Sequence, residues 1–286
     1  MQNKLIASKV TQLCVLFMFS ACVSVQGGEW SLHQNRDGKW TTEQERNKDG
    51  PLKNSLDTGV YKGKIEPGDS RRLIDFLIKN DGRIDKIFLE SPGGDVQEAI
   101  RVGEVINKAR LDVYVQMNQT CASACFFVWL NGANRAVIFV GRPNGGRVGL
   151  HRPYLVDIGN TPDSISSQSK IMQNLVRYLE SKLISRRLVD MMISRPSNDI
   201  YWLRDDDVTE LGQSPPELEE LYIAKCGDNR RQLYRQMTIA KSNSNQELYD
   251  VLLHNVGTVN DCIDDLNSAT RNNFLASARI SSMRTK

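Results

Sequence analysis

Along the middle of the chain, segments with apolar residues at helical spacing alternate with short apolar runs. Residues 71–80 and 96–109 carry apolar side chains at helical spacing. Short apolar runs typical of strands flank them: residues 85–90, 111–116, 135–140 and 147–153. This β-α-β order predicts an α/β fold with a mainly parallel sheet and right-handed crossovers, whose functional loops lie at the carboxyl ends of the strands.

The segments outside this core have a different composition. Residues 28–56 are polar and irregular, which favours a loosely attached arm. Within the core, which we place at residues 57–215, we expect a long helix over residues 164–187 and a capped helix ending at Gly212. Residues 216–286 are polar and helical with few apolar anchors, and we interpret them as a small helical appendage.

The first 27 residues have the pattern of a signal peptide. A lysine-containing start precedes the apolar run Leu13–Ala21, which is too short for a comfortable membrane span. Cleavage near Gly27 would give a soluble exported protein. Alternatively, "FSAC", ending at Cys22, is similar to a bacterial lipobox with phenylalanine in place of the usual leucine, and a lipid on Cys22 would tether the chain to a membrane. Both interpretations predict export, to the periplasm or as an outer-membrane lipoprotein.

Composition excludes some classes of function. The chain has 286 residues and 40% hydrophobic content, enough for a large core. Its 37 basic and 34 acidic residues give a net charge of +3 without a basic block, so we expect no nucleic-acid partner.

Four cysteines remain beyond the signal segment, an even number in an oxidising compartment. Cys226 and Cys262 are the natural pair by elimination. Cys121 and Cys125 either form a second disulfide or stay reduced and buried. At i,i+4 spacing these two would fall on one face of a helix, and the residue midway between them would point elsewhere.

Three features carry candidate chemistry. Ser91-Pro92-Gly93-Gly94 directly follows a buried strand, and paired glycines let a backbone N–H approach a ligand closely. Its alternative is an ordinary strand-to-helix turn.

Ser123 lies between two alanines at the expected first turn of an apolar helix, where its hydroxyl could enter a cleft. Its alternative is an N-cap or a small packing residue. His151 ends a core strand, whereas His33 and His254 lie in the arm and the tail. Its alternative is a satisfied core histidine.

The blocks "SPGGDV", "CASACFFV" and "VGLHRP" together resemble those of the proteolytic subunit of the ATP-dependent Clp protease, and more closely its exported bacterial relatives. The resemblance covers about residues 60–212 and implies a Clp/crotonase-like β-α-β spiral core. By position it makes Ser123 the nucleophile, His151 the general base and Asp199 the acid. It also makes the backbone N–H groups of Gly94 and Ala124 the oxyanion donors. Asp205, Asp206 and Asp207 are expected to be charges at a helix N-terminus instead.

The implied reaction is peptide-bond hydrolysis on a peptide or unfolded protein, without a cofactor or metal. The family's homo-oligomeric assembly is a further expectation. Because export removes the chain from ATP, we expect an ATP-independent peptidase. The main alternative is a catalytically inactive Clp-like binding or assembly protein of the cell envelope, since fold does not imply function. Minor alternatives are a metal site of Cys121, Cys125 and His151, and a thiol redox site.

Overall fold

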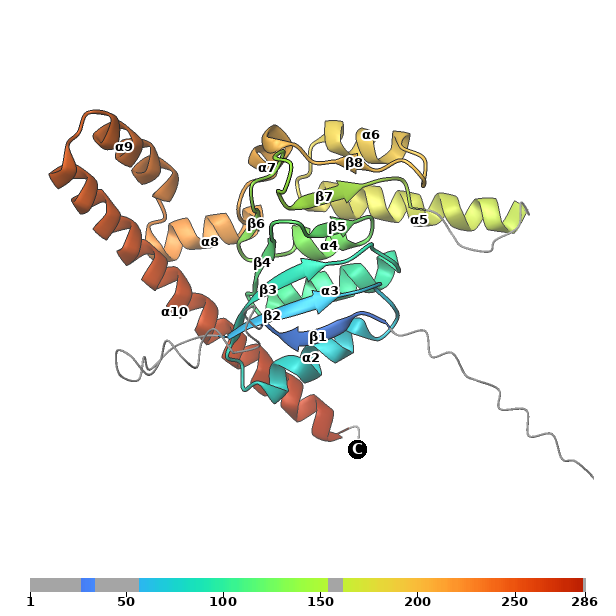
Figure 1. Cartoon of the computed structure of the whole chain (residues 1–286). Coiled ribbons are helices and arrows are strands. Elements are labelled where there is room, and N and C mark those ends of the chain that lie inside the picture. The colour runs from blue at the N-terminus through green and yellow to red at the C-terminus, as the bar shows by residue number, and fades with distance from the viewer. Residues whose placement is uncertain (1–26, 34–56, 154–161, 285–286) are drawn as a thin grey trace, which may run out of the picture.

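The computed structural model describes residues 27–33, 57–153 and 162–284 (Figure 1). The predicted signal peptide up to residue 26, the lipid site at Cys22 and most of the predicted arm lie outside these residues. In the part of the chain that is described, no helix combines the length and apolar character needed to cross a membrane.

A five-stranded sheet forms the centre of the molecule, in the order β1-β2-β3-β4-β6. Strands β2, β3, β4 and β6 are mutually parallel, and β1 is an antiparallel edge strand. The bounds are β1 Glu29–Leu32, β2 Asp57–Lys62, β3 Ile84–Glu90, β4 Asp112–Val115 and β6 Arg135–Val137. The prediction of a mainly parallel sheet is confirmed.

Strand β1 corrects the expectation that residues 28–56 are irregular from their start. Its alternate residues Trp30 and Leu32 pack on the main core, and the Trp30 ring lies 4.6 Å from that of Tyr61 on β2. These two apolar residues in a polar stretch are enough to form an edge strand because β2 supplies the backbone partners.

A second, three-stranded sheet has the order β5-β7-β8. It consists of β5 Thr120–Ala122, β7 Arg147–Leu150 and β8 Tyr201–Trp202. β5 and β7 are parallel, and β8 is antiparallel to β7. This small sheet brings the carboxyl ends of β5 and β7 side by side.

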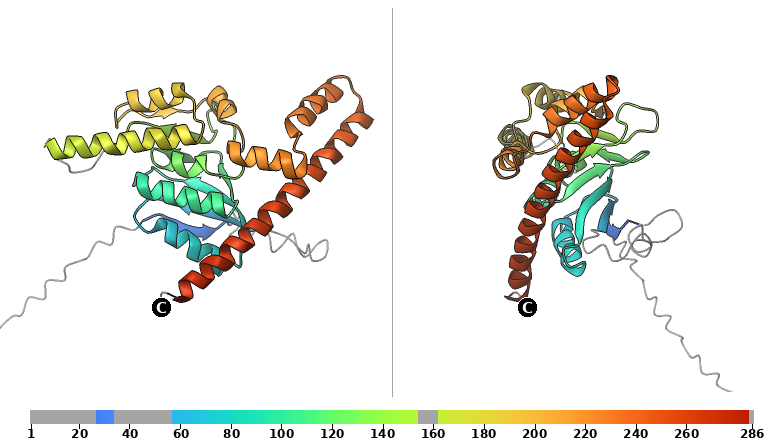
Figure 2. Two further views of the ribbon diagram at one scale, coloured as in Figure 1. Left: turned by 180° about the vertical axis from the view of Figure 1, so that it is seen from behind. Right: turned by 90° about the vertical axis from the view of Figure 1, so that its left-hand side faces the viewer.

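Helices α2 Asp69–Lys79 and α3 Val96–Lys108 cover the face of the large sheet that is turned toward the viewer in the left panel of Figure 2. Asp95 caps α3, because its side chain accepts a hydrogen bond from the Glu98 N–H. All six residues of α4 Cys125–Leu130 are buried, which makes this short helix part of the core.

The single helix expected over residues 164–187 is two helices, α5 Pro162–Ser181 and α6 Arg186–Ser194. The chain breaks between them because Leu183 has a left-handed backbone and the Ser185 side chain caps α6. α5 projects beyond the carboxyl ends of the strands (Figure 1). α7 Asp205–Leu211 follows β8 and ends before Gly212, as expected.

The C-terminal region is helical, as predicted, and consists of α8 Pro216–Cys226, α9 Arg230–Ser242 and α10 Gln246–Arg284. α9 and the first part of α10 form a hairpin that extends away from the sheets (Figure 2). This hairpin has its own apolar cluster of Leu233, Met237, Ala240, Leu252 and Val256. The Cys226–Cys262 disulfide joins α8 to α10.

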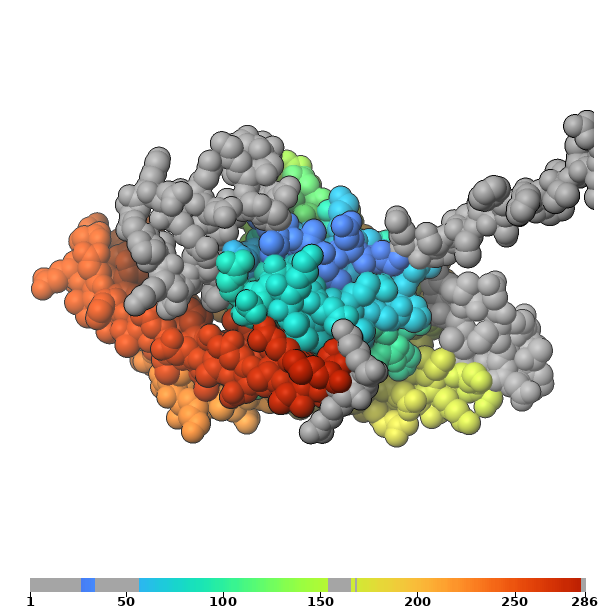
Figure 3. All heavy atoms as spheres, turned by 90° about the horizontal axis from the view of Figure 1, so that it is seen from below, coloured from blue at the N-terminus to red at the C-terminus, as the bar shows by residue number. Residues whose placement is uncertain are grey.

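The remainder of α10 is more firmly anchored than the sequence indicates. It lies along α2 on the underside of the molecule (Figure 3). Leu275 is 3% exposed and belongs to the main core, and the Arg271 guanidinium donates hydrogen bonds to the carbonyls of Ala109 and Arg110 at the end of α3.

Candidate functional site

Ser123 lies in a sharp turn between β5 and α4, and its φ angle is 56°. A left-handed backbone is unfavourable for a residue with a side chain. Four other described residues of this kind each lie just beyond the end of a helix, where such a conformation is common: Asp81, Arg110, Leu183 and Ser244. Ser123 instead precedes a helix. Strained residues of this kind cluster at functional sites.

The neighbouring strand holds this turn in place. The Ser123 N–H donates to the Gly149 carbonyl at 2.8 Å, which is the last hydrogen bond of the parallel pairing of β5 with β7. Ser123 is therefore fixed at the carboxyl end of β5, and by this register it lies one residue before the level of His151 on the adjacent chain segment. The expectation that Ser123 lies at the start of a buried helix fits this geometry, whereas β5 was not among the predicted strands.

Cys121 and Cys125 form a disulfide across the same turn, with 5.1 Å between their Cα atoms. The sequence indicated two cysteines on one helical face, but Cys121 belongs to β5 and only Cys125 belongs to α4. The bond therefore joins the end of a strand to the first turn of a helix, with Ser123 in the loop. Because both sulfurs are bonded to each other, they are not arranged as metal ligands here.

The backbone of Gly93 lies directly against this turn. A Cβ atom at Gly93 would lie 2.6 Å from the Ala122 carbonyl oxygen, 2.7 Å from the Ser123 Cβ and 2.9 Å from the Ala124 nitrogen. The φ angle of Gly93 is also positive, at 96°. Only glycine satisfies both conditions, which gives the first glycine of the pair a role that the sequence did not assign.

The N–H group of the second glycine, Gly94, is directed toward β5 by the hydrogen bonds of its neighbours. The Gly93 carbonyl accepts from the Ile65 N–H and the Asp95 N–H donates to the Ile65 carbonyl, so Gly94 is in a parallel bridge with Ile65. In such a bridge the N–H of the bridged residue points to the opposite edge. That edge faces β5, because Ser91 exchanges hydrogen bonds with Thr120 and Ala122 there.

Ala124 supplies the second candidate N–H group. It is 1% exposed and lies at the N-terminus of α4, where the first backbone N–H groups have no partner within the helix. The predicted oxyanion donors, Gly94 and Ala124, thus lie on the two segments that meet at Ser123. Their assignment as donors stays a prediction.

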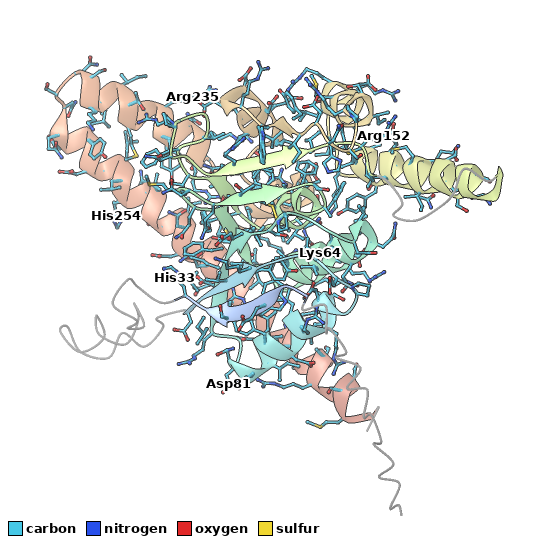
Figure 4. The ribbon with its side chains drawn as sticks, turned by 45° about the vertical axis from the view of Figure 1, so that its right-hand side comes forward. His33, Lys64, Asp81, Arg152, Arg235 and His254 are labelled. Carbon is cyan, nitrogen blue, oxygen red and sulfur yellow. A yellow bond between two sulfur atoms is a disulfide. The ribbon has the colours of Figure 1, made fainter. Side chains whose placement is uncertain are left out.

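His151 directly follows β7 and is 7% exposed. Its Nδ1 lies 2.9 Å from the carbonyl oxygen of Arg152. A carbonyl can only accept a hydrogen bond, so this contact places a proton on Nδ1. The other two histidines are remote from this strand end: Figure 4 shows His33 at the edge of the large sheet and His254 on α10.

Asp199 lies just before β8. The antiparallel pairing of β7 with β8 ends at Leu150 and Tyr201, and Asp199 lies two residues before Tyr201. The Asp199 carboxylate is half exposed and forms an ion pair with Arg195, with 2.7 Å between Nη1 and Oδ2. The side chain of Asp199 therefore has an arginine as its ion-pair partner. Its role as the acid stays a prediction.

The three aspartates that begin α7 lie in its first turn, as expected. Asp207 is the buried one. Burial raises its pKa, but hydrogen bonds from the Arg204 N–H, Arg187 and Tyr201 outweigh this effect and lower the pKa below its ordinary value. Since all these partners hold its carboxylate, Asp207 serves to cap α7 and join it to α6 and β8.

An open cleft adjoins the residue after His151. Its volume is about 840 Å³ and it is lined by Arg152, Ser169, Met172, Gln173, Val176, Arg177 and Ile193. Most of this lining comes from α5, whose inner end packs on α4 through the rings of Tyr178 and Phe127. Among the described residues, no group of three or more histidine, cysteine or carboxylate side chains could hold a metal ion.

Fold and site together define a mixed α/β protein with a serine in a strained turn at the strand ends. No protein-family model and no curated protein sequence matches the chain. Among solved structures it is similar to ClpP1 from Listeria monocytogenes, with 19% identity and a TM-score of 0.41 over 54% of this chain and 86% of that one.

It is also similar to the membrane-bound stomatin-specific protease 1510-N, with 17% identity and a TM-score of 0.39 over 59% of this chain and 83% of that one. ClpP1 belongs to the family that the three sequence blocks resemble. At these TM-scores we take nothing about the site from either match.

Proposed function

We propose that this chain is an exported, ATP-independent serine peptidase with Ser123 as nucleophile and His151 as general base. The observation that carries the proposal is the left-handed turn at Ser123, beside the strand that ends at His151. A serine on a strained strand-to-helix turn presents its hydroxyl outward from the end of a sheet, where a neighbouring base can reach it.

In the proposed reaction, the Ser123 Oγ attacks the substrate carbonyl while its proton moves to Nε2 of His151. The N–H groups of Gly94 and Ala124 stabilise the oxyanion that forms, each contributing roughly 10²–10³ in rate. His151 then donates the proton to the leaving amine as the C–N bond breaks. Water attacks the acyl-enzyme by the same route and releases the second product.

Two groups are candidates for orienting His151. The Arg152 carbonyl already accepts from Nδ1, and the predicted acid Asp199 is paired with Arg195. Replacing Asp199 by asparagine separates the two roles. A triad aspartate stabilises the imidazolium cation, and its loss costs about 10⁴ in kcat. If the Arg152 carbonyl is sufficient, kcat for Asp199→Asn stays close to that of the wild type.

A fluorophosphonate probe tests the proposal directly, because it reacts only with an activated serine. We expect the mature wild-type protein to be labelled, and Ser123→Ala and His151→Ala to lose labelling. Ser194→Ala is the matched control, since this exposed serine on α6 only donates to the Met191 carbonyl. Equal labelling of wild type and Ser123→Ala would remove Ser123 as the nucleophile. Hydrolysis of an unstructured peptide without ATP then distinguishes a peptidase from other serine hydrolases.

A second candidate function is a catalytically inactive, Clp-like binding or assembly protein of the cell envelope. The ion pair between Asp199 and Arg195 favours it, because it occupies the predicted acid. This candidate predicts no labelling of the wild-type protein and binding of unfolded chains without cleavage.

Export is part of the proposal. Two disulfides are compatible with an oxidising compartment. Mass spectrometry of the mature N-terminus distinguishes a free end near Gly27 from a lipid on Cys22. Sedimentation of the same material tests the expected homo-oligomer.

A further inference from the structure

The cleft beside His151 is lined by both apolar and cationic residues. Met172, Val176 and Ile193 give it apolar walls, whereas Arg152 and Arg177 bring two guanidinium groups into its lining. No carboxylate is among the lining residues that the structure describes. The cleft is therefore apolar with an excess of positive charge.

Neither arginine is neutralised by an acid among the described residues. Arg177 donates to the Asn174 side-chain oxygen at 2.6 Å, which is a neutral partner. The ion pairs found in the described parts of the chain include neither Arg152 nor Arg177, although nearby Arg195 is paired with Asp199. A guanidinium next to apolar walls and without a counter-charge binds carboxylates strongly, often through two parallel hydrogen bonds.

Arg152 is also firmly positioned beside the proposed base. Its carbonyl contacts Nδ1 of His151, and its N–H donates to the Arg195 carbonyl at 3.1 Å. The backbone of Arg152 is thus held from both sides, and Arg152 lines the cleft one residue away from His151. A molecule bound in the cleft lies next to the site of hydrolysis.

We infer that this cleft binds the substrate and selects peptides in which apolar residues adjoin a carboxylate, with Arg152 and Arg177 binding that carboxylate. The inference rests on the proposed function, because it takes the occupant to be the peptide that Ser123 cleaves. A volume of about 840 Å³ is within the range of ligand pockets, roughly 300–1,000 Å³, and accommodates several side chains. The carboxylate belongs either to an acidic side chain or to a peptide C-terminus.

Binding to the Ser123→Ala protein tests the inference without requiring catalysis. Fluorescence anisotropy compares a labelled unstructured peptide of apolar residues and one glutamate with the same peptide carrying glutamine. We expect the glutamate peptide to bind about tenfold more tightly, the effect of one charge-assisted hydrogen-bond pair. A peptide with an amidated C-terminus, compared with the free acid, identifies which carboxylate is recognised.

Arg152→Gln and Arg177→Gln, each added to Ser123→Ala, should bring the ratio of the two affinities close to one. Arg235→Gln is the matched control, because this exposed arginine lies on α9, on the other side of the molecule from Arg152 (Figure 4). It removes the same charge and should preserve the ratio. Circular dichroism of each variant verifies that the fold is kept.

Equal binding of the two peptides, or a ratio that Arg152→Gln and Arg177→Gln leave unchanged, would overturn the inference even if the protein proves to be a peptidase. Conversely, selective binding with no probe labelling of the wild type would refute the proposed catalysis and keep the cleft as a binding site. Self-association that Arg152→Gln abolishes would assign the cleft to an interface between copies and also overturn the inference.

Discussion

Replacing Gly93 by alanine tests how the turn that contains Ser123 is held in place. The new methyl group would lie 2.6–2.9 Å from the Ala122 carbonyl oxygen, the Ser123 Cβ and the Ala124 nitrogen. Ordinary contacts begin at about 3.5 Å, so the turn must move by up to roughly 1 Å. Two of these three atoms belong to the proposed nucleophile and oxyanion donor.

The expected effect follows from that displacement. A shift of about 1 Å at a catalytic group costs on the order of 10²-fold in rate. The positive φ of Gly93 adds about 1–2 kcal/mol of backbone strain when a Cβ is present. We therefore expect Gly93→Ala to fold with a lower Tm and to react with the fluorophosphonate about 100-fold more slowly than the wild type.

Gly227→Ala is the matched control for this prediction. Gly227 also has a positive φ, of 62°, but a Cβ there would have no atom within 4 Å, and the residue caps α8. It should lose comparable stability from backbone strain and keep the labelling rate. If the two variants are labelled at the same rate, or if Gly93→Ala is labelled as fast as the wild type, the close contact does not position Ser123.

Three further predictions concern the crosslinks and a buried carboxylate. Replacing Cys121 and Cys125 by alanine should lower the free energy of unfolding by about 2 kcal/mol, because the disulfide closes a short loop. It should also slow the labelling of Ser123. Unchanged labelling would show that the disulfide does not hold the turn. Replacing Cys226 and Cys262 removes a crosslink over 36 residues and should lower the free energy of unfolding by about 4 kcal/mol. We expect faster hydrogen exchange in α8 and α10 and unchanged peptide hydrolysis. Loss of hydrolysis would contradict the independence of the site from the C-terminal helices. Burial, followed by the charge of Asp85, raises the pKa of Asp112 to about 6, from an ordinary value of 3.8. Because the folded state then binds the proton more tightly than the unfolded state, Asp112 makes the protein more stable as pH falls from 7 toward 4, by up to roughly 3 kcal/mol. Asp112→Asn should lose this gain in urea unfolding at pH 7 and pH 4.5, and parallel pH dependences of wild type and variant would refute it.

The parts of the fold that follow from local patterns could be predicted from the sequence. The helical spacing of apolar residues in 71–80 and 96–109 corresponds to α2 and α3. The short apolar runs that became β3, β4 and β6 belong to the mainly parallel sheet. The strand-end position of His151 was predictable for the same reason, because it follows the apolar run of β7, whereas β5, the strand before Ser123, was not predicted.

The features that were missed depend on distant parts of the chain. The left-handed backbone of Ser123 has no local sequence signal, and the residues that lie against this turn, Gly93 and Gly149, are distant from it in the chain. β1 can be recognised as a strand only together with β2, because β2 supplies its backbone partners. By contrast, the Arg195–Asp199 ion pair could have been anticipated, because opposite charges four residues apart often meet where the chain turns.

The anchoring of α10 has a consequence for how the protein is made. Leu275 fills part of the same core as Leu77 of α2, and Arg279 pairs with Asp81 at the end of that helix. The first helix of the α/β core is therefore covered by a segment that follows it in the chain by nearly the whole described length, since Arg279 lies 198 residues after Asp81. A nascent chain shorter than this leaves the apolar face of α2 open to water or to chaperones. Closure of this part of the core therefore waits until residues 275–279 have been synthesised.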